Sequence, residues 1–247
     1  MSRIVWKPAS KSSRTRLTRG ALSAGAAVLL PLLAACGGSS STTAEDTSPT
    51  SSPASSSGGV TCDYADAPQG KTGDASKPPA SPDVQGQVSV SMTTSIGTLA
   101  ATLDAAKAPC TVNSFVSLAK QGYFDKSPCH RLTTAASGIF VLQCGDPTGT
   151  GTGGPGYTVP DELSGKETYG PGTLAMANSS QPNTGGSQFF IVYQQTPLPP
   201  KYTVFGQLDA AGLKDVQKMA KQGSDDAFGD GDGHPKVPVT IQSVTVG

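Results

Sequence analysis

The sequence predicts a mainly β, α+β fold for the C-terminal two thirds of the chain. Residues 87–95 alternate apolar and polar side chains, and short apolar stretches recur through residues 138–193. Two longer stretches, residues 110–121 and 209–222, repeat apolar residues at helical spacing and lie far apart in the sequence. Many short strands with two separated helices fit a closed antiparallel barrel whose ends are covered by the helices, although the pattern alone predicts only a β-rich, α+β fold.

The first two predicted strands form a hairpin. Val88 and Met92 fall on the same side of the first strand because successive strand side chains point to opposite faces. Gly97 allows a turn into a second strand over residues 98–103. Further strands are expected at residues 138–143, 174–177, 189–193 and 238–246.

The first predicted helix begins beside Pro109 and ends at Gly122. Proline suits the first helical turn, where its missing N–H has no partner in any case, and glycine commonly follows a helix end. Phe115 and Leu118 belong to its apolar face. The second helix has an apolar face of its own, made of Leu213, Val216 and Ala220.

The N-terminus has the composition of an export signal. Six of the 18 basic residues lie in the first 20 positions, where there is no acidic residue, and an apolar run follows at residues 21–33. This pattern predicts a signal peptide over residues 1–35 that is too short to span a bilayer. The Leu-Ala-Ala-Cys sequence that ends at Cys36 resembles a bacterial lipobox. It implies a lipidated Cys36 and an extracytoplasmic protein anchored to the bacterial cell membrane; the alternative is an ordinary signal peptide with a chance cysteine.

A tether is expected over residues 36–85, before a folded domain at residues 86–247. Serine, threonine and proline dominate its first part, which has too few apolar side chains to offset the entropy of ordering. In its second part, Cys62 and Tyr64 favour attachment to the domain, whereas a Lys-Pro-Pro sequence favours a linker.

The charge of the chain excludes nucleic acid as a partner. The formal net charge of zero includes the basic N-terminus. From Cys36 onward, 12 basic residues face 18 acidic ones, a formal charge of −6, so the chain has no positive excess to bind phosphates.

Three motif matches carry little functional weight. Residues 151–156 fit G-x-G-x-x-G, but the proline and acidic residues that follow do not begin a nucleotide-binding helix. Residues 225–233 are rich in Asp and Gly, yet they lack the ligand spacing of a calcium loop, so a solvated loop is expected. His130 and His234 are the only histidines, and no G-x-S-x-G accompanies them, which disfavours a hydrolase.

Four cysteines remain after Cys36, and an even number in an exported chain predicts two disulfides. Three pairings are possible; we expect Cys110 with Cys129 and Cys62 with Cys144, and the alternative is four free thiols. No Cys-x-x-Cys spacing occurs, so no metal site is expected.

One stretch, GPGTLAMANSSQPNTGGSQFF at residues 170–190, combines small residues, amides and two phenylalanines. These suit an apolar groove with fixed hydrogen-bonding groups, and a reaction that breaks no covalent bond. The stretch resembles the cyclophilin family of peptidyl-prolyl isomerases, and so do four further motifs in family order: C-H-R at 129–131, F-V-L-Q-C-G-D at 140–146, D-E at 161–162 and V-F-G at 204–206.

The resemblance, which covers residues 87–247, implies a closed eight-stranded antiparallel barrel capped by two α-helices. It implies peptidyl-prolyl cis-trans isomerisation of Pro-containing exported polypeptides, without a cofactor. We expect the protein to act as a monomer.

The resemblance also implies roles for individual residues. Arg131 is the expected hydrogen-bond donor to the prolyl nitrogen, because its guanidinium is planar and always charged. Gln143, Asn178 and Gln188 are expected to act with it. The positions implied to bind substrate are His130, Phe140, Val141, Ala177, Phe190, Leu198 and Tyr202.

The chain departs from the common family pattern in the groove. Val141 stands where the family has methionine, the family's tryptophan before Leu198 is absent, and Tyr202 stands where many members have histidine. The stretch between Arg131 and Phe140 is also longer. An alternative function is therefore a catalytically weak module that binds Pro-containing segments or acts as a chaperone; an inert surface lipoprotein would leave the groove residues unexplained.

Overall fold

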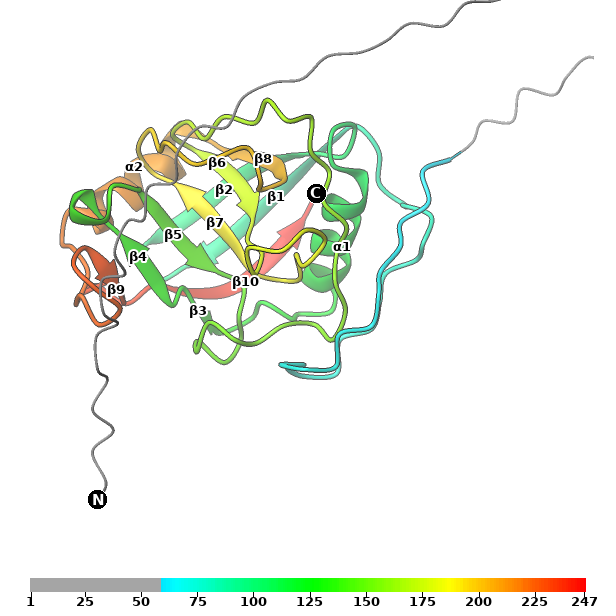
Figure 1. Ribbon diagram of the computed structural model, residues 1–247, viewed down its shortest axis with the longest axis horizontal. Helices are drawn as coiled ribbons and strands as arrows, with labels where there is room; N and C mark the ends of the chain where they lie inside the picture. Colours follow the sequence, from blue (N-terminus) through cyan, green and yellow to red (C-terminus); the bar gives the residue numbers. More distant parts are fainter. Residues whose placement is uncertain (1–58) are drawn as a thin grey trace, which may run out of the picture. The chain divides into compact units, whose positions relative to one another are not determined.

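The computed structural model describes residues 59–247; the predicted signal peptide, Cys36 and the first part of the expected tether, residues 36–58, lie outside the described residues. Within this range the chain forms a curled antiparallel sheet with a helix at each end (Figure 1). The helices are α1 (Pro109–Lys120) and α2 (Ala210–Ala220), with a 3-10 turn at Ala135–Ser137. The strands are β1 (Gln87–Thr94), β2 (Gly97–Asp104), β3 (Ser127–Pro128), β4 (Arg131–Thr133), β5 (Val141–Cys144), β6 (Thr173–Met176), β7 (Phe189–Val192), β8 (Val204–Leu208), β9 (Asp232–Gly233) and β10 (Thr240–Val246). No helix among residues 59–247 is both long enough and apolar enough to cross a membrane.

The sheet closes on itself through its shortest strands. The strand order is β3-β10-β1-β2-β8-β6-β7-β5-β4-β9, and β3 and β4 are separated by two residues. The backbone N–H of Cys129, between them, donates to the carbonyl of Val239 at 2.8 Å. If β3 and β4 are counted as one bent strand and the two-residue β9 is set aside, the barrel has the eight strands implied by the sequence. The predicted fold class is confirmed.

The sequence located most of the elements that it predicted to within about two residues, including the four-residue strands β6 and β7. β1, β2, α1, α2 and β10 all lie within about two residues of their predicted bounds. The strand predicted from residue 138 begins later, at Val141, because the 3-10 turn ends at Gly138 with a φ of 79°. β3, β4, β8 and β9, of two to five residues, were not predicted as strands.

Aromatic side chains fill the barrel where α1 covers it. Phe115 of α1 stacks on Phe124 with ring centroids 4.9 Å apart and meets Phe189 and Phe205 at 5.5 Å each. All four side chains are almost wholly buried. Burying a phenylalanine contributes roughly 1.5–3 kcal/mol, so this cluster fixes α1 and β7 against each other.

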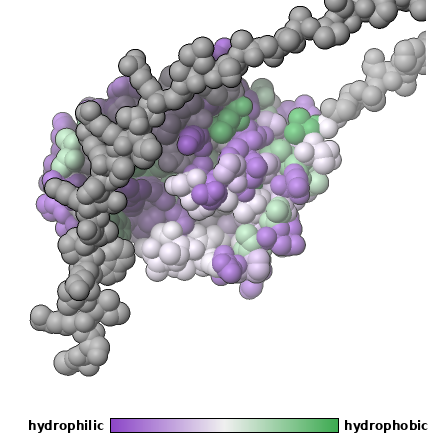
Figure 2. Space-filling model, viewed as in Figure 1, coloured by the Kyte–Doolittle hydropathy of each residue, from purple (hydrophilic) through white to green (hydrophobic). Residues whose placement is uncertain are grey.

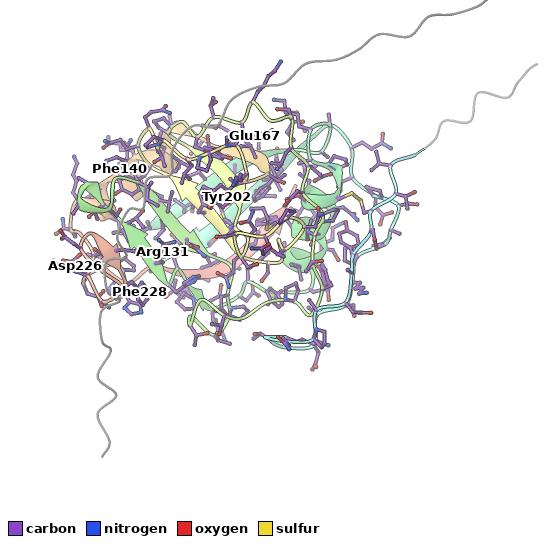
Figure 3. All side chains as sticks on the ribbon, in the orientation of Figure 1. Arg131, Phe140, Glu167, Tyr202, Asp226 and Phe228 are labelled. Carbon is purple, nitrogen blue, oxygen red and sulfur yellow. A yellow bond between two sulfur atoms is a disulfide. The ribbon has the colours of Figure 1, made fainter. Side chains whose placement is uncertain are left out.

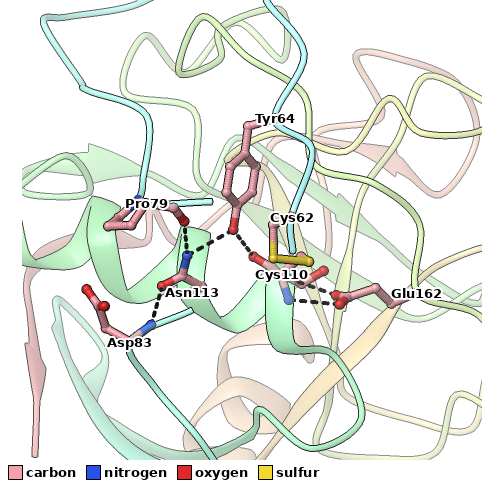
Figure 4. Close-up of a disulfide and its surroundings, with 8 residues drawn as sticks. Cys62, Tyr64, Pro79, Asp83, Cys110, Asn113 and Glu162 are labelled. Carbon is pink, nitrogen blue, oxygen red and sulfur yellow. Dashed lines mark hydrogen bonds between the residues drawn. A yellow bond between two sulfur atoms is a disulfide. The ribbon is translucent and has the colours of Figure 1, made fainter. Parts of the chain in front are cut away.

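The N-terminus of α1 is capped by a side chain from a distant loop. Ala108 precedes the helix and has no side-chain group to accept a hydrogen bond. Instead, the N–H groups of Cys110 and Thr111 donate to the two carboxylate oxygens of Glu162, at 2.8 and 2.9 Å (Figure 4). A carboxylate is favoured at this end of a helix by the helix dipole. Glu162 of the D-E motif therefore has a structural role, because it caps the N-terminus of α1.

Residues 60–85, here called the N-terminal strap, pack against the domain. Cys62 is disulfide-bonded to Cys110, and the Tyr64 hydroxyl donates to the Cys110 carbonyl at 2.8 Å (Figure 4). The Asn113 amide donates to the Tyr64 hydroxyl and to the Pro79 carbonyl. The domain therefore begins near residue 60, earlier than the expected boundary at residue 86, because these contacts hold a segment whose composition resembles a linker.

The four cysteines form two disulfides, as predicted, but the expected pairing was wrong. The pairs are Cys62 with Cys110 and Cys129 with Cys144. Cys129 precedes β4 and Cys144 ends β5, and antiparallel pairing of these strands brings the two Cα atoms within 4.0 Å. Cys110, at the start of α1, faces the N-terminal strap.

The described surface exposes few large apolar side chains. On the face drawn in Figure 2, apolar surface occurs in small, separate patches within polar surroundings. The large apolar residues that are exposed among residues 59–247 are Val60, Leu163, Phe228 and Val237.

Candidate active site

The outward face of β4, β5, β7 and β6 carries a row of predicted site residues. Arg131 pairs with Gln143, Gln143 with Phe190, and Phe190 with Ala175 across successive antiparallel strands. Directly paired residues project from the same face of a sheet. The strand register therefore aligns a cation, an amide and an aromatic ring across three strands, with Ala175 of β6 beside the ring.

An apolar patch continues this row beyond Phe190, separate from the core inside the barrel. Its buried members are Val141, Tyr169, Ala175, Phe190 and Val192, against which Ala177, Leu198, Tyr202 and Val204 pack. The Phe190 and Tyr202 rings meet edge-on, with centroids 5.3 Å apart. Tyr169 fixes Tyr202 by exchanging hydrogen bonds with its backbone. The patch can hold a small apolar ring beside the polar end of the row.

Arg131 is held from two sides. Its Nε donates to Asp232 Oδ1 at 2.7 Å and its Nη2 to Asp232 Oδ2 at 2.6 Å, a bidentate ion pair. Its Nη1 donates to Gln143 Oε1 at 3.3 Å. The hydrogen bonds and charge of Asp232 raise the pKa of Arg131 above its already high ordinary value. The guanidinium side chain keeps 33% exposure, so it remains accessible from the groove.

Two amides extend this network to residues 149–157, here called the glycine-rich loop. Gln143 Nε2 donates to Gln188 Oε1 at 2.9 Å, and Gln188 Nε2 donates to the carbonyls of Gly151 and Gly153. An arginine can only donate and a carbonyl can only accept. The two ends of the network therefore fix the orientation of both amides.

Asn178 separates two cavities beside the row. Its amide donates to the Lys201 carbonyl at 2.8 Å, which ties the loop after β6 to the loop before β8. One cavity, of about 360 Å³, lies between the glycine-rich loop and Asn178, and the other, of about 390 Å³, lies towards Tyr202. The first cavity is also lined by Ala67 and Gln69 of the N-terminal strap.

Comparison with known proteins assigns this site to a family. A sequence model described as cyclophilin type peptidyl-prolyl cis-trans isomerase/CLD matches residues 89–246. The chain belongs to the cyclophilin family. It is 47% identical over 200 residues to the probable peptidyl-prolyl cis-trans isomerase B of Mycobacterium tuberculosis, covering 75% of this chain and 64% of that protein. The Mycobacterium leprae protein of the same name is 47% identical over 201 residues, covering 75% and 66%. The chain spans just under two thirds of the length of these relatives.

Solved structures agree with this assignment. A cyclophilin type peptidyl-prolyl cis-trans isomerase of Cryptosporidium parvum is 29% identical, with a TM-score of 0.56 over 65% of this chain and 98% of that one. The structure of that protein in the presence of the dipeptide Ala-Pro is 30% identical, with a TM-score of 0.54 over 64% and 98%. The N-terminal strap lies before the part of this cyclophilin that the family model matches.

Two predicted substrate-binding residues of this cyclophilin lie away from the groove. His130 is 5% exposed and lies beneath the glycine-rich loop; burial lowers the pKa of its imidazole. Phe140 packs against the barrel core and meets Tyr193 edge-on at 5.8 Å. Both residues are direct neighbours of groove residues, Arg131 and Val141, and strand alternation turns neighbours to opposite faces. The other nine predicted site residues line the row, the patch or the cavities.

Sequence reasoning missed Asp232 and Asp146. Asp232 lies in the loop that was expected to be solvated, 101 residues from its partner Arg131. Asp146 is part of the predicted F-V-L-Q-C-G-D motif, but nothing in the sequence indicated its role. Spacing could not have revealed either contact, because both depend on loops that fold back onto the sheet.

Asp146 organises the glycine-rich loop of this cyclophilin from below. Its Oδ1 accepts from the backbone N–H and hydroxyl of Thr148, and its Oδ2 accepts from the N–H groups of Gly151 and Gly153. A Cβ on residue 153 would collide with this carboxylate, so only glycine fits there. Burial alone would raise the pKa of Asp146, but hydrogen bonds from Thr148, Gly153 and Gly151 outweigh it and lower the pKa.

We expect Asp146→Asn to destabilise the domain by about 1–3 kcal/mol at neutral pH, because an amide N–H₂ would face backbone donors. The lowered pKa also predicts an acid dependence. The stabilisation is fully present above the unfolded pKa near 3.9 and is lost as the pH falls through the lower folded pKa. Urea unfolding of both proteins between pH 7 and pH 2.5 checks this. Equal acid dependence in the variant and the wild type would contradict the assignment.

Proposed function

We propose that this cyclophilin is a peptidyl-prolyl cis-trans isomerase that acts as a monomer on Pro-containing segments of exported polypeptides. The proline ring would bind on the apolar patch around Phe190, and Arg131 would donate a hydrogen bond to the prolyl nitrogen. Gln143, Asn178 and Gln188 would position the arginine and the substrate backbone.

The proposed mechanism follows from the chemistry of the peptide bond. Delocalisation of the nitrogen lone pair gives a rotation barrier of about 18–20 kcal/mol. In the twisted transition state the lone pair returns to nitrogen, which becomes a hydrogen-bond acceptor. A cationic donor fixed beside that nitrogen stabilises this state more than either planar form, and an apolar surround strengthens the interaction.

The single observation that carries this proposal is the row from Arg131 through Gln143 to Phe190. In this row a restrained cation lies at the edge of an apolar patch, which supports the proposed roles of donor and proline-ring site. The names of the relatives and the Ala-Pro dipeptide in the Cryptosporidium parvum structure support the same assignment.

A two-dimensional NMR exchange experiment on an Ala-Pro peptide tests the activity. Catalysis is expected to produce cis–trans exchange cross-peaks on a timescale far shorter than the uncatalysed tens to hundreds of seconds. A peptide that binds, as shown by shifts in the protein spectrum, but whose isomers do not exchange would support the alternative of a binding module instead. Val141 and Tyr202 differ from the common family residues at these groove positions, so the experiment must distinguish catalysis from binding alone.

We propose further that the protein is exported and anchored through a lipidated Cys36. The signal-like N-terminus supports export, and so do the two disulfides, since disulfides persist in oxidising compartments. A diacylated cysteine would hold the domain at the membrane, because each buried CH₂ adds about 0.8 kcal/mol.

Replacing Cys36 with serine is expected to abolish lipidation and to move the processed protein from the membrane fraction to the membrane-free fraction. Isomerase activity of the serine variant should equal that of the wild type, which makes activity the control for correct folding. Fractionation of a bacterial host that expresses each form is the measurement. If the processed serine variant stays with membranes as strongly as the wild type, the lipobox interpretation is wrong.

A further inference from the structure

We infer that Asp232 is a positioning residue that holds the Arg131 guanidinium in the orientation needed to reach the substrate. This inference rests on the proposed isomerase function and assigns a role to the Asp- and Gly-rich loop, residues 225–233. The sequence had indicated only a solvated loop there.

The contact between Asp232 and Arg131 is built into the sheet. β9 pairs with β4, so that Asp232 lies opposite Thr133 and Gly233 opposite Leu132. The Asp232 side chain is 20% exposed and reaches Arg131 through two hydrogen bonds of 2.6 and 2.7 Å. Paired, parallel N–H···O bonds of this kind fix the plane of a guanidinium as well as its position.

The arrangement leaves part of the guanidinium free. Arginine has five N–H groups, and Asp232 and Gln143 together accept from three of them. The remaining two are on Nη1 and Nη2. Because Asp232 holds the Nε edge and Gln143 holds Nη1, the free N–H groups cannot swing away without breaking a hydrogen bond. A donor that is already oriented has less entropy to lose when substrate binds.

Hydrogen bonds within residues 225–233 hold this loop in place (Figure 3 labels Asp226 and Phe228 next to β9). Asp225 accepts hydrogen bonds from the N–H groups of Ala227 and His234, and Asp226 accepts from that of Gly231. A Cβ on residue 233 would collide with the Asp225 carboxylate, so the turn into β9 requires glycine. These acidic side chains stabilise the loop that presents Asp232.

The opposite role for Asp232, restraint of Arg131 in an unproductive position, makes a different prediction. A restraining carboxylate would have to be displaced before catalysis, so its removal would raise turnover. A positioning carboxylate lowers turnover when it is removed. The sign of the change in kcat therefore decides between the two.

The experiment compares Asp232→Asn with the matched control Asp230→Asn. Asp230 is exposed in the same loop, and its carboxylate accepts no hydrogen bond from residues 59–247. The amide of Asp232→Asn keeps the size of the carboxylate but presents donors to a group that only donates. We expect kcat to fall about 10-fold with KM little changed, whereas the control stays within about two-fold of the wild type. NMR line-shape analysis of a proline peptide titration gives kcat and KM separately.

A second readout does not depend on activity. The Nε–H resonance of Arg131 should exchange slowly with solvent in the wild type and in Asp230→Asn, and rapidly in Asp232→Asn. If Asp232→Asn keeps wild-type kcat, or gains turnover, the inference is overturned. If the wild type itself lacks turnover, the proposed function fails, and only the Nε–H exchange then tests whether Asp232 holds Arg131. Equal exchange rates in the wild type and both variants would show that it does not.

Discussion

Replacing Arg131 with alanine is expected to lower kcat/KM for X-Pro isomerisation at least about 10-fold while the domain stays folded. The loss of one hydrogen bond to a transition state costs on the order of 2–4 kcal/mol, and Arg131 is the cationic donor beside the apolar patch. Because its side chain is one third exposed and lies outside the barrel core, its removal should leave the packing of the barrel intact.

Arg131→Lys is the matched comparison. Lysine keeps the charge but not the planar fork, so it cannot reproduce the simultaneous contacts with Asp232 and Gln143. We expect it to recover only a small part of the lost activity. Circular dichroism must match the wild type for either result to count. Wild-type turnover in folded Arg131→Ala would remove the donor mechanism altogether.

The sequence predicted most directly those strands whose apolar and polar residues alternate. β1 has eight residues and alternates between buried and exposed positions, so its hydrophobic pattern identifies it. β5, β6 and β7 have four residues each, most of them buried on both faces, and a run of buried residues has no period to detect. Their apolar runs still placed β6 and β7 within one residue, whereas the predicted β5 began three residues too early.

The sequence motifs predicted which segments contribute to the groove. Which of their side chains point into it depends on how the strands pair, and the sequence did not give that pairing. Gln143 and Phe190 come from distant motifs and meet because β5 and β7 pair. The same alternation removes His130 and Phe140 from the groove. His130 directly precedes Arg131, and Phe140 directly precedes Val141. Adjacent residues of a strand face opposite sides, so both members of either pair could not point into the groove.

Contacts made by loops were beyond sequence reasoning. The capping of α1 by Glu162 and the ion pair of Arg131 with Asp232 join residues 51 or more positions apart, through segments with no regular period. The disulfide pairing was missed for the same reason, because it depended on which strands and loops become neighbours. In each case the sequence did not identify which residues become partners.

Removal of the Cys62–Cys110 disulfide by a double serine substitution is expected to lower the free energy of unfolding by about 4 kcal/mol. The two cysteines lie 48 residues apart, and a cross-link across a loop of that length restricts the unfolded chain strongly. The Cys129–Cys144 pair is 15 residues apart, so the matching double serine variant should lose less, about 3 kcal/mol. Urea unfolding of the oxidised wild type and both variants measures the difference.

The two variants should also differ in where they loosen the structure. The N-terminal strap depends on Cys62 together with backbone hydrogen bonds such as Ala67 N–H to the Gly156 carbonyl, at 2.9 Å. Without the cross-link, the strap amides should exchange faster with solvent, and the cavity that Ala67 and Gln69 line should open on that side. Cys129 and Cys144 flank Arg131 and Gln143, so loss of that pair should instead affect turnover. Unchanged exchange in the strap after removal of Cys62–Cys110 would show that its packing, not the disulfide, holds it in place.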